Sequence, residues 1–390
     1  MAVIFIPGIK GTELVDTYPL DHPQRWPTPG TQAGDMIESP REFALIDGRH
    51  DTDGHWMQPS RLVHQICGPM INKLRAQLAP EPVYAFGYDW RKPLEDAALR
   101  LVRMLDDVAA RERAVGRDAE LKFVTHSMGG LLLRSALALR NRREPLADVS
   151  RIVFIAPPFR GAMGSPYALV AGETDDWFGT GPDYRKVTRG FPSVYQMTPS
   201  WPGAAVDEDG KHVDLFDPAN WQDSVAQGGS FQADFLRNAE AFVRDRKARH
   251  GGCSQAPMLG DAALATASDK AIIICGSGQP TPCKLPVLTR NRSNRNWFDF
   301  AHMGIDARGD GRVWMPSAAI EGVTLAAFAD SGEHALLCRD ERVNHLTAQW
   351  LSGRKAVALR PRLPKDAAKR QRRYFRPWDG RIESLDTHIV

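Results

Sequence analysis

The chain has 390 residues, of which 43 % are hydrophobic and 25 % charged, and its formal net charge is +3 at pH 7. This composition is ordinary for a globular protein, and the length allows one large α/β domain with insertions, or two domains. The small net charge does not by itself indicate nucleic-acid binding. No run of 18 consecutive apolar residues predicts a membrane span.

The N-terminal run MAVIFIP has no basic segment before its short apolar stretch, which stops at Pro7. It therefore predicts a first strand and not a secretory signal. The five cysteines show no CxxC spacing, so neither a disulfide framework nor a zinc site is expected. We expect a cytoplasmic protein, with export by a signal-independent route left open.

Six short, β-rich apolar runs predict buried strands, each followed by Gly, Pro, Asp or Ser. In chain order they cover residues 2–7, 82–90, 121–125, 151–157, 270–276 and 323–329. Between them, the spacing of apolar residues predicts a helix over 94–113, and 129–140 is typical of a largely apolar helix close to a sheet. Strands that alternate with helices predict a mostly parallel sheet covered on both faces.

Two long stretches interrupt this alternation. Residues 11–60 are rich in Pro, Gly and Asp, and residues 158–268 combine many aromatic residues with an amphipathic segment near 231–247. Stretches this long within a compact domain usually form a lid or a subdomain. Further on, residues 354–376 hold ten Lys and Arg residues against one acid, Asp366.

The stretch FVTHSMGG, residues 123–130, places Ser127 between a predicted strand and a predicted helix. In a nucleophile elbow, this sharp turn exposes the serine Oγ and aims the next backbone N–H, that of Met128, at the substrate. The usual pattern is Gly-x-Ser-x-Gly, and Thr125 stands in the place of its first glycine. A serine that only caps the following helix is the alternative, but the flanking strand and helix favour a nucleophile.

A serine nucleophile needs a base and an acid that orients the base, and on this kind of sheet the three follow in the order Ser, Asp or Glu, His. The motif RGDGRV places Asp310 in a loop, and EHALL places His334 a few residues after the last predicted strand. Both lie where the carboxyl ends of the strands are expected, which is where open α/β sheets hold their sites.

Other residues compete for these two roles. His302 precedes the acid and so has the wrong order, while His345 lies in a helical pattern and is interpreted as structural. Asp299 and Asp306 remain rivals of Asp310, which taken alone would be a turn residue in an Asp-Gly pair.

A second oxyanion donor is expected from the loop after the first strand. In FIPGIKGTEL the Pro7–Gly8 pair turns the chain, so that the N–H of Ile9 can point toward the elbow. A plain turn at the end of a strand is the alternative.

Seven motifs in one order resemble those of the lecithin:cholesterol acyltransferase family, which includes lysosomal-type phospholipase A and bacterial acyl hydrolase relatives. They are VIFIPGIKGTEL, YAFGYDWR, HSMGG, VFIAPPFRGA, FPSVYQMTPS, GDGRV and EHALL. The resemblance implies an α/β-hydrolase fold with a lid loop and an inserted cap subdomain. It places the hydrolase domain at 1–350, with a lid-type region at 11–60 and a cap insertion at 160–265, followed by a basic C-terminal extension at 351–390.

By the same resemblance, the family's catalytic residues fall on Ser127 as nucleophile, Asp310 as acid and His334 as base, and its oxyanion donors fall on Ile9 and Met128. The YDWR motif at residues 88–91 looks structural in the family and receives no chemistry. Thr125, the sequence APPFRGA, and the absence of a signal peptide and of a lid disulfide depart from the family pattern. These departures bear on the substrate more than on the chemistry.

Together these features predict a serine-dependent acyl-ester hydrolase or O-acyltransferase that acts on phospholipid-type esters through a Ser-His-Asp triad and an acyl-enzyme. The alternatives are a carboxylesterase for non-lipid esters and a catalytically silent lipid-binding protein of the same fold. A lipid or apolar ester is the expected partner, nucleic acid is not expected, and the oligomeric state stays open. The mechanism needs no cofactor.

The segment DGRHDTDGHW, residues 47–56, resembles part of a calcium loop but lacks the closing Glu, so we expect a solvated loop and no metal site. The basic C-terminal segment carries interleaved aromatic residues, which suit contact with an anionic membrane surface. A solvated surface segment or a disordered end is the alternative for it.

Overall fold

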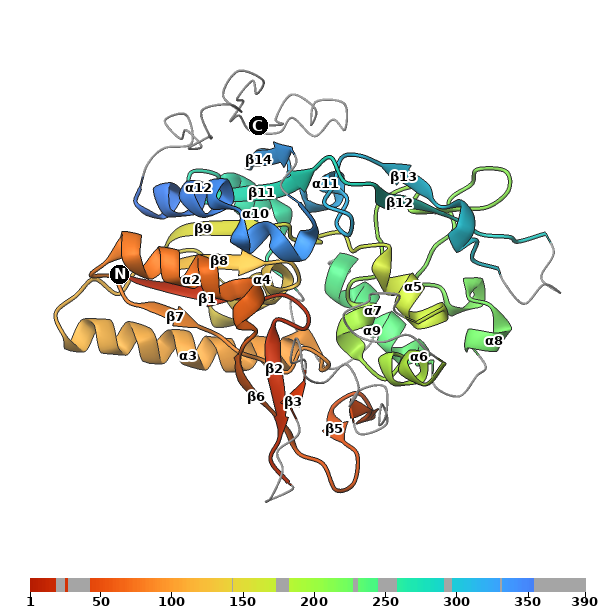
Figure 1. Ribbon diagram of the computed structural model, residues 1–390, viewed down its shortest axis with the longest axis horizontal. Coiled ribbons are helices and arrows are strands. Elements are labelled where there is room, and N and C mark those ends of the chain that lie inside the picture. Colours follow the sequence, from red (N-terminus) through yellow and green to blue (C-terminus); the bar gives the residue numbers. More distant parts are fainter. Residues whose placement is uncertain are drawn as a thin grey trace.

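A parallel sheet forms the centre of the protein (Figure 1). The computed structural model describes residues 1–18, 25–26, 43–141, 143–172, 182–226, 231–244, 258–290, 297–329 and 332–353. The six strands of the sheet are β1 (Ala2–Ile6), β7 (Val83–Ala85), β8 (Leu121–His126), β9 (Val149–Ile155), β11 (Ala271–Ser277) and β14 (Thr324–Ala329). Their spatial order is β14-β11-β9-β8-β1-β7, and every neighbouring pair is parallel.

All six strands predicted from the apolar runs belong to this sheet, and the α/β fold class is confirmed. One of them is shorter than predicted, because β7 ends at Ala85. Phe86 still donates its N–H to the carbonyl of Phe5 at 2.9 Å. Beyond it, Tyr88 and Trp90 donate side-chain hydrogen bonds to the segment that follows β1, so the chain leaves the sheet there.

Helices cover both faces of the sheet, as predicted. On one face lie α3 (Leu94–Ala114) and α4 (Gly129–Arg140), and on the other lie α2 (His64–Leu78) and α12 (Glu341–Leu351). Successive strand residues point to opposite faces, so alternate residues of β1 belong to two separate apolar clusters, one packed on each pair of helices.

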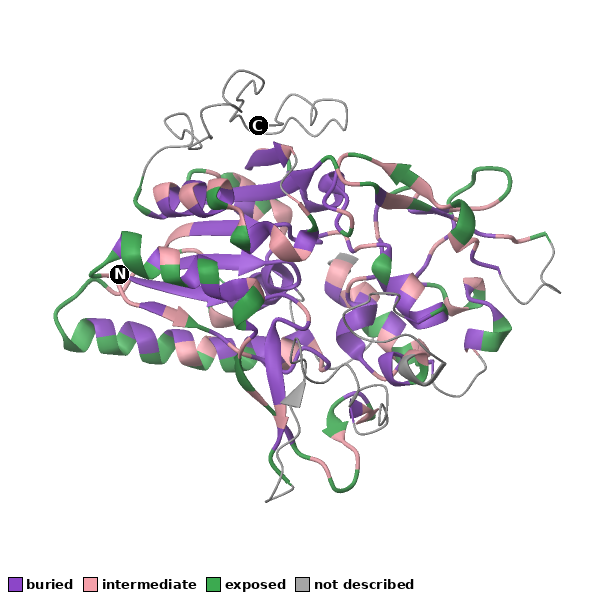
Figure 2. Cartoon of the chain, in the orientation of Figure 1, coloured by how far each residue is buried: buried purple, intermediate pink, exposed green. Residues whose placement is uncertain are grey.

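Burial follows from this layering. Every residue of β1, β8 and β11 is buried, and Figure 2 shows the sheet as a continuous buried layer. Strands covered on both faces read as continuous apolar runs, which is why the sequence reveals them so clearly. Helix α4 is buried from Gly129 to Ala138, as expected for the apolar helix predicted there.

Between β9 and β11 the chain leaves the sheet for a long insertion, most of which lies to one side of it in Figure 1. Its elements are α5 (Gly164–Val170), α6 (Pro182–Thr188), α7 (Pro192–Tyr195), β10 (Ala205–Val206), η2 (Pro218–Asn220), α8 (Asp223–Ala226), α9 (Ala233–Arg244) and α10 (Asp261–Thr266). The amphipathic segment predicted near 231–247 corresponds to α9. A second excursion, between β11 and β14, contains β12 (Thr281–Pro286), η3 (Phe300–His302), β13 (Gly304–Asp306) and α11 (Met315–Ala318).

The region predicted as a lid-type loop contains short strands in its described residues. An antiparallel arm consists of β2 (Thr12–Asp16), β3 (Arg25–Trp26) and β6 (Met57–Leu62), and beside it β4 (Leu45–Ile46) pairs with β5 (His50–Asp51). The basic segment 354–376 lies outside the described residues. Among the helices that are described, none is both long and apolar enough to span a bilayer.

Candidate active site

Ser127 occupies a tight turn between β8 and α4. Its φ angle is +52°, in the left-handed region that non-glycine residues rarely adopt. The turn is held from both sides, because the Ser127 N–H donates to the carbonyl of Ile155 at 2.8 Å and its carbonyl accepts from Gly130 at 2.9 Å. The first helical residue is Gly129, and Met128 precedes it as N-cap. This is the strand–turn–helix geometry of a nucleophile elbow.

Glycines let other backbone segments approach this turn closely. A Cβ added at Gly8 would lie 2.7 Å from the Cβ of Ser127 and 3.2 Å from its Oγ. A Cβ added at Gly129 would lie 2.5 Å from the carbonyl oxygen of Ile6. The second residue of PGIKG and the first glycine of HSMGG therefore serve to bring the loop after β1 against the elbow.

Thr125 is accommodated without glycine at this position. It lies within β8, pairs with Ile6 and Phe154 on the two neighbouring strands, and is fully buried. Its hydroxyl makes no hydrogen bond in the described part of the protein. The substitution therefore leaves the elbow intact and adds one buried, unpaired hydroxyl.

Asp310 and His334 form a buried pair, although they lie 24 residues apart. The His334 Nδ1 lies 2.8 Å from the Asp310 Oδ2, and the His334 backbone N–H donates to the Asp310 carbonyl at 3.0 Å. The other carboxylate oxygen of Asp310 accepts from the backbone N–H groups of Arg312 (3.1 Å) and Val313 (2.8 Å). The imidazole is thus held by a carboxylate that is itself fixed on both of its oxygens.

The rival residues have other partners. Asp306 binds Arg308 and accepts from the indole of Trp314 at 2.9 Å. His302 pairs with Asp299, with its side chain 80 % exposed. His345 lies on α12, where its Nε2 is 2.7 Å from the amide nitrogen of Gln349. Among these candidate aspartates and histidines, only Asp310 and His334 form a buried pair.

His126 connects the elbow to this pair. Its ring centroid lies 4.8 Å from that of His334, and its Nε2 is 3.1 Å from the His334 carbonyl oxygen. Burial, together with a smaller effect of the neighbouring His334, lowers the pKa of His126 to about 3. His126, the residue before Ser127, therefore packs against His334. In the described structure no hydrogen bond joins the Ser127 Oγ to the His334 ring. Such bonds are often long in unliganded sites and tighten when substrate binds.

Side chains of the YDWR motif, residues 88–91, hold the loop after β1 by hydrogen bonds. The Tyr88 hydroxyl donates to the carbonyl of Pro7 at 3.0 Å, and the Trp90 indole donates to the carbonyl of Thr12 at 3.1 Å. Within the loop, the Gly11 N–H donates to Gly8 at 3.1 Å, and Lys10 has a φ of +58°. These bonds reach residues about 80 positions earlier in the chain, so the motif YDWR alone does not reveal them.

The two predicted oxyanion donors belong to the two segments that meet at Ser127, the loop after β1 and the elbow. Ile9 belongs to the loop that Gly8 brings against the elbow, and Met128 directly follows Ser127. Among the described residues, neither backbone N–H donates a hydrogen bond to another protein group. Two unused donors beside one hydroxyl are what an oxyanion site requires.

Apart from Asp53, the charged residues of the 47–56 segment have protein partners. Asp51 binds the buried guanidinium of Arg91 at 2.6 Å, and His55 lies 2.6 Å from Asp16. Arg91 also binds Asp89 at 2.7 Å. Burial alone would raise the pKa of Asp89, but the adjacent Arg91 lowers it below its ordinary value. No group of three His, Cys, Asp or Glu residues in the described ranges is arranged to hold a metal ion.

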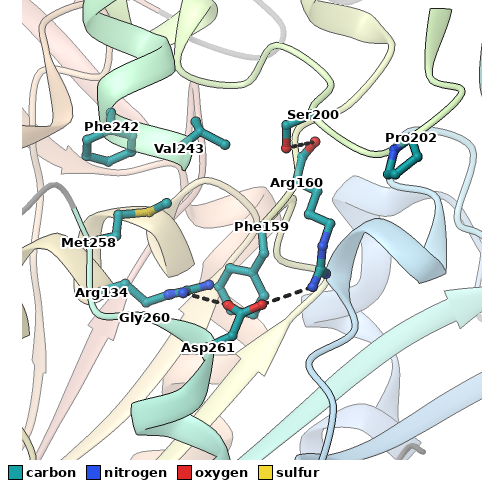
Figure 3. Close-up of a pocket in the computed structure, with 10 residues that line it drawn as sticks. All are labelled: Arg134, Phe159, Arg160, Ser200, Pro202, Phe242, Val243, Met258, Gly260 and Asp261. Carbon is teal, nitrogen blue, oxygen red and sulfur yellow. Dashed lines mark hydrogen bonds and ion pairs between the residues drawn. The ribbon is translucent and has the colours of Figure 1, made fainter. Parts of the chain in front are cut away.

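A cavity of about 430 Å³ is lined by Arg134 of α4 and by residues of the insertion between β9 and β11 (Figure 3). Asp261 bridges two arginines there, binding Arg134 at 2.7 Å and Arg160 at 2.9 Å. Apolar side chains of α9 and the residue Phe159 complete its wall. None of Ser127, Asp310 and His334 lines this cavity, and its charges are paired, so it is separate from the site described above.

Comparison with known proteins agrees with this architecture. Residues 71–227 match the sequence model of the lecithin:cholesterol acyltransferase family. No curated protein matches the chain. Among solved structures, a chain of the Tle4–Tli4 complex is similar with a TM-score of 0.57 and 14 % identity, over 90 % of this chain and 97 % of that chain. At this identity the likeness shows the fold alone.

Two further structures are more distant. Phospholipase PlaB from Legionella pneumophila is 12 % identical with a TM-score of 0.35, over 82 % of this chain and 46 % of its own. The Bacillus licheniformis lipase BlEst2 is 12 % identical with a TM-score of 0.34, over 87 % of this chain and 86 % of its own. The fold class predicted from the sequence, a mostly parallel sheet with helices on both faces, is confirmed by the strand order. The resemblance to the lecithin:cholesterol acyltransferase family inferred from the motifs is confirmed over residues 71–227.

Proposed function

We propose that the protein is a serine-dependent acyl-ester hydrolase or O-acyltransferase that acts on lipid esters, with Ser127, His334 and Asp310 as its triad. The observation that carries the proposal is the arrangement of these residues. A left-handed serine ends a central strand, a buried Asp–His pair lies at the same end of the sheet, and His126 brings the two together. The match to the lecithin:cholesterol acyltransferase family supports lipid as the substrate class.

In this mechanism the Ser127 Oγ attacks the ester carbonyl while His334 Nε2 accepts its proton. Asp310 holds Nδ1 of the same ring, which fixes the reactive tautomer and stabilises the imidazolium that forms. The N–H groups of Ile9 and Met128 bind the oxyanion. The tetrahedral intermediate then expels the alcohol, which takes the proton from His334, and leaves an acyl-enzyme.

The second half of the reaction reverses these roles. Water, or an alcohol in a transfer reaction, loses its proton to His334 as it attacks the acyl carbon, and Ser127 leaves with that proton restored. We assign the insertion over 160–265 to a cap that shields the acyl group, because its described helices bury many aromatic side chains, including Trp201, Tyr195 and Trp221. The lid role of 11–60 and the cytoplasmic location stay predictions.

A fluorophosphonate probe and product analysis test the proposal together. Wild-type protein should be labelled and should release fatty acid, or form an acylated acceptor, from mixed phospholipids; Ser127→Ala should do neither while keeping its melting temperature. Ser135→Ala is a matched control, because Ser135 is a buried serine on α4, the helix that follows Ser127, and its hydroxyl has no hydrogen-bond partner in the described structure.

The alternatives have distinct outcomes. Turnover of short soluble esters without release from phospholipid would indicate a carboxylesterase. Folded wild-type protein that binds lipid but is neither labelled nor active would indicate a silent lipid-binding protein. Labelling that persists in Ser127→Ala would remove Ser127 from the mechanism.

A further inference from the structure

His126 is a buried histidine in the site to which the proposed mechanism gives no role. It is the last residue of β8, and that strand is paired on both sides, with β1 and with β9. Its backbone position is therefore set by the centre of the sheet and not by a loop. Only 5 % of its surface is exposed, so a side chain of this polarity requires a hydrogen-bond partner.

The partner of the His126 ring is the backbone of His334. A carbonyl oxygen can only accept, so the His126 Nε2, at 3.1 Å from it, must carry the proton. The two rings also face one another at 4.8 Å with an interplanar angle of 33°. One side chain thus contacts both the main chain and the ring of the proposed base.

The contact of His126 with His334 differs from those that Asp310 makes with the same residue. Asp310 binds the His334 N–H at 3.0 Å and Nδ1 at 2.8 Å, so it fixes the amide and one edge of the ring. Among the described residues, His126 supplies the side-chain donor to the His334 carbonyl, which is also the first carbonyl of the 3-10 helix His334–Arg339. With both bonds in place, the residue is held at two points of its main chain, and rotation of the ring about χ1 is limited by the packed imidazole.

We propose that His126 is a positioning residue for His334, donating from Nε2 to the His334 carbonyl so that the strand end that carries Ser127 also sets the place of the base. This inference rests on the proposed function. It explains why the residue before the nucleophile is a donor-bearing ring in a position that is otherwise apolar. Small displacements of a base from its nucleophile are costly, and a shift of 1 Å can reduce turnover about 100-fold.

The test compares His126→Gln with His126→Asn on the full-length protein. The two side chains carry the same amide, but only that of Gln reaches about as far as the imidazole Nε2. We expect His126→Gln to keep kcat within a few-fold of wild type, and His126→Asn to lose roughly 10- to 100-fold in kcat with little change in KM. Equal kcat in the two variants, or an Asn variant as active as wild type, would overturn the proposal.

A second measurement does not depend on a folded Asn variant. In protein labelled with 15N-histidine, the signal of His126, assigned by its loss in His126→Gln, should show an Nε2-protonated neutral ring. An Nδ1-protonated ring could not donate to the carbonyl and would also overturn the proposal. Ser127→Ala is measured in parallel, because activity that survives in that variant refutes the proposed function, whereas the tautomer result concerns His126 alone.

Discussion

Two regions of this protein contain the same local arrangement of aspartate and histidine. In the antiparallel arm, the buried Asp16 accepts from His55 Nδ1 at 2.6 Å and from the N–H groups of Trp56 (2.9 Å) and Tyr18 (3.0 Å). At the end of the sheet, Asp310 accepts from His334 Nδ1 and from two backbone N–H groups at similar distances. In both pairs one carboxylate oxygen faces the ring and the other faces the main chain.

The difference between the pairs lies in their surroundings. His334 packs on the imidazole of His126, the residue that precedes the left-handed Ser127, whereas His55 lies among arm residues and is partly exposed. An Asp–His pair alone therefore does not identify a catalytic site, because the same contacts can serve only to fasten a loop. What distinguishes the sheet-end pair is the nucleophile elbow that it meets.

The largest predicted contrast comes from changing each aspartate to asparagine. Asp310→Asn should lower kcat on the order of 10⁴-fold, because an amide cannot hold the imidazole in the tautomer that accepts the serine proton. Asp16→Asn should leave kcat within a few-fold and lower the free energy of unfolding by about 1–3 kcal/mol, since it weakens a buried hydrogen-bond network. Ester hydrolysis and urea unfolding measure the two effects. If the two variants lost activity equally, the comparison would fail.

The second imidazole at the sheet end gives a pH-dependent contrast. The pKa of His126 is about 3 in the folded protein and 6.5 in an unfolded chain. Between these values the unfolded state binds the extra proton, so this contribution to stability is complete above pH 6.5 and is lost as the pH falls. Wild type should therefore lose about 1.4 kcal/mol of unfolding free energy per pH unit relative to His126→Gln between pH 6 and pH 5.

Urea unfolding of both proteins at several pH values measures this difference. If the free energies of unfolding of wild type and His126→Gln changed equally with pH, burial would not hold His126 neutral. The pH dependence would then not distinguish the sheet-end pair from the pair in the arm.

The anchored loop is a third feature that only the sheet-end site has. Tyr88→Phe removes the hydroxyl that donates to the Pro7 carbonyl, and burial keeps the pKa of Tyr88 above its ordinary value, so this donor is present at neutral pH. We expect a loss of about 1 kcal/mol in the free energy of unfolding and a several-fold lower kcat from a less fixed oxyanion loop. Tyr18→Phe in the arm is the control, because Tyr18 is 64 % exposed. Equal kcat in the two variants would count against an anchoring role for Tyr88.

The smallest predicted effect concerns the residue that departs from the elbow pattern. Thr125→Val replaces an unpaired buried hydroxyl by a methyl group, so it should raise the free energy of unfolding by up to about 1 kcal/mol and leave kcat within twofold. Thr347→Val is a matched control, because Thr347 is also buried with an unpaired hydroxyl but lies on α12. A drop in kcat confined to Thr125→Val would show that this hydroxyl acts in the site.

The central sheet could be predicted from the sequence because its strands are buried on both faces and therefore read as apolar runs. The arm could not, because strands such as β6, with the sequence MQPSRL, are half exposed and lack such a run. Spatial strand order was likewise beyond the sequence, since β1 lies between β7 and β8 through contacts distant in the chain.

The residues proposed for the site follow from the sequence, but the contacts that hold them do not. Chain order pointed to Asp310 and His334, and the structure brings these two together. The contact of His126 with His334 and of Tyr88 with Pro7 join residues 208 and 81 positions apart, so no local pattern reveals them. Within the motifs HSMGG and YDWR, nothing in the sequence marks His126 or Tyr88 as the residue that makes such a contact.

The left-handed backbone of Ser127 lowers the stability of the fold at the residue that carries the proposed nucleophile. A left-handed conformation costs an ordinary L-residue about 1–2 kcal/mol, and glycine escapes this cost. A chain selected only for durability would therefore accept glycine at residue 127, and a chain that retains serine there gives up stability for a hydroxyl in that place. By the same reasoning, Ser127→Gly is the first substitution to make for a more stable version of this scaffold that lacks the proposed nucleophile.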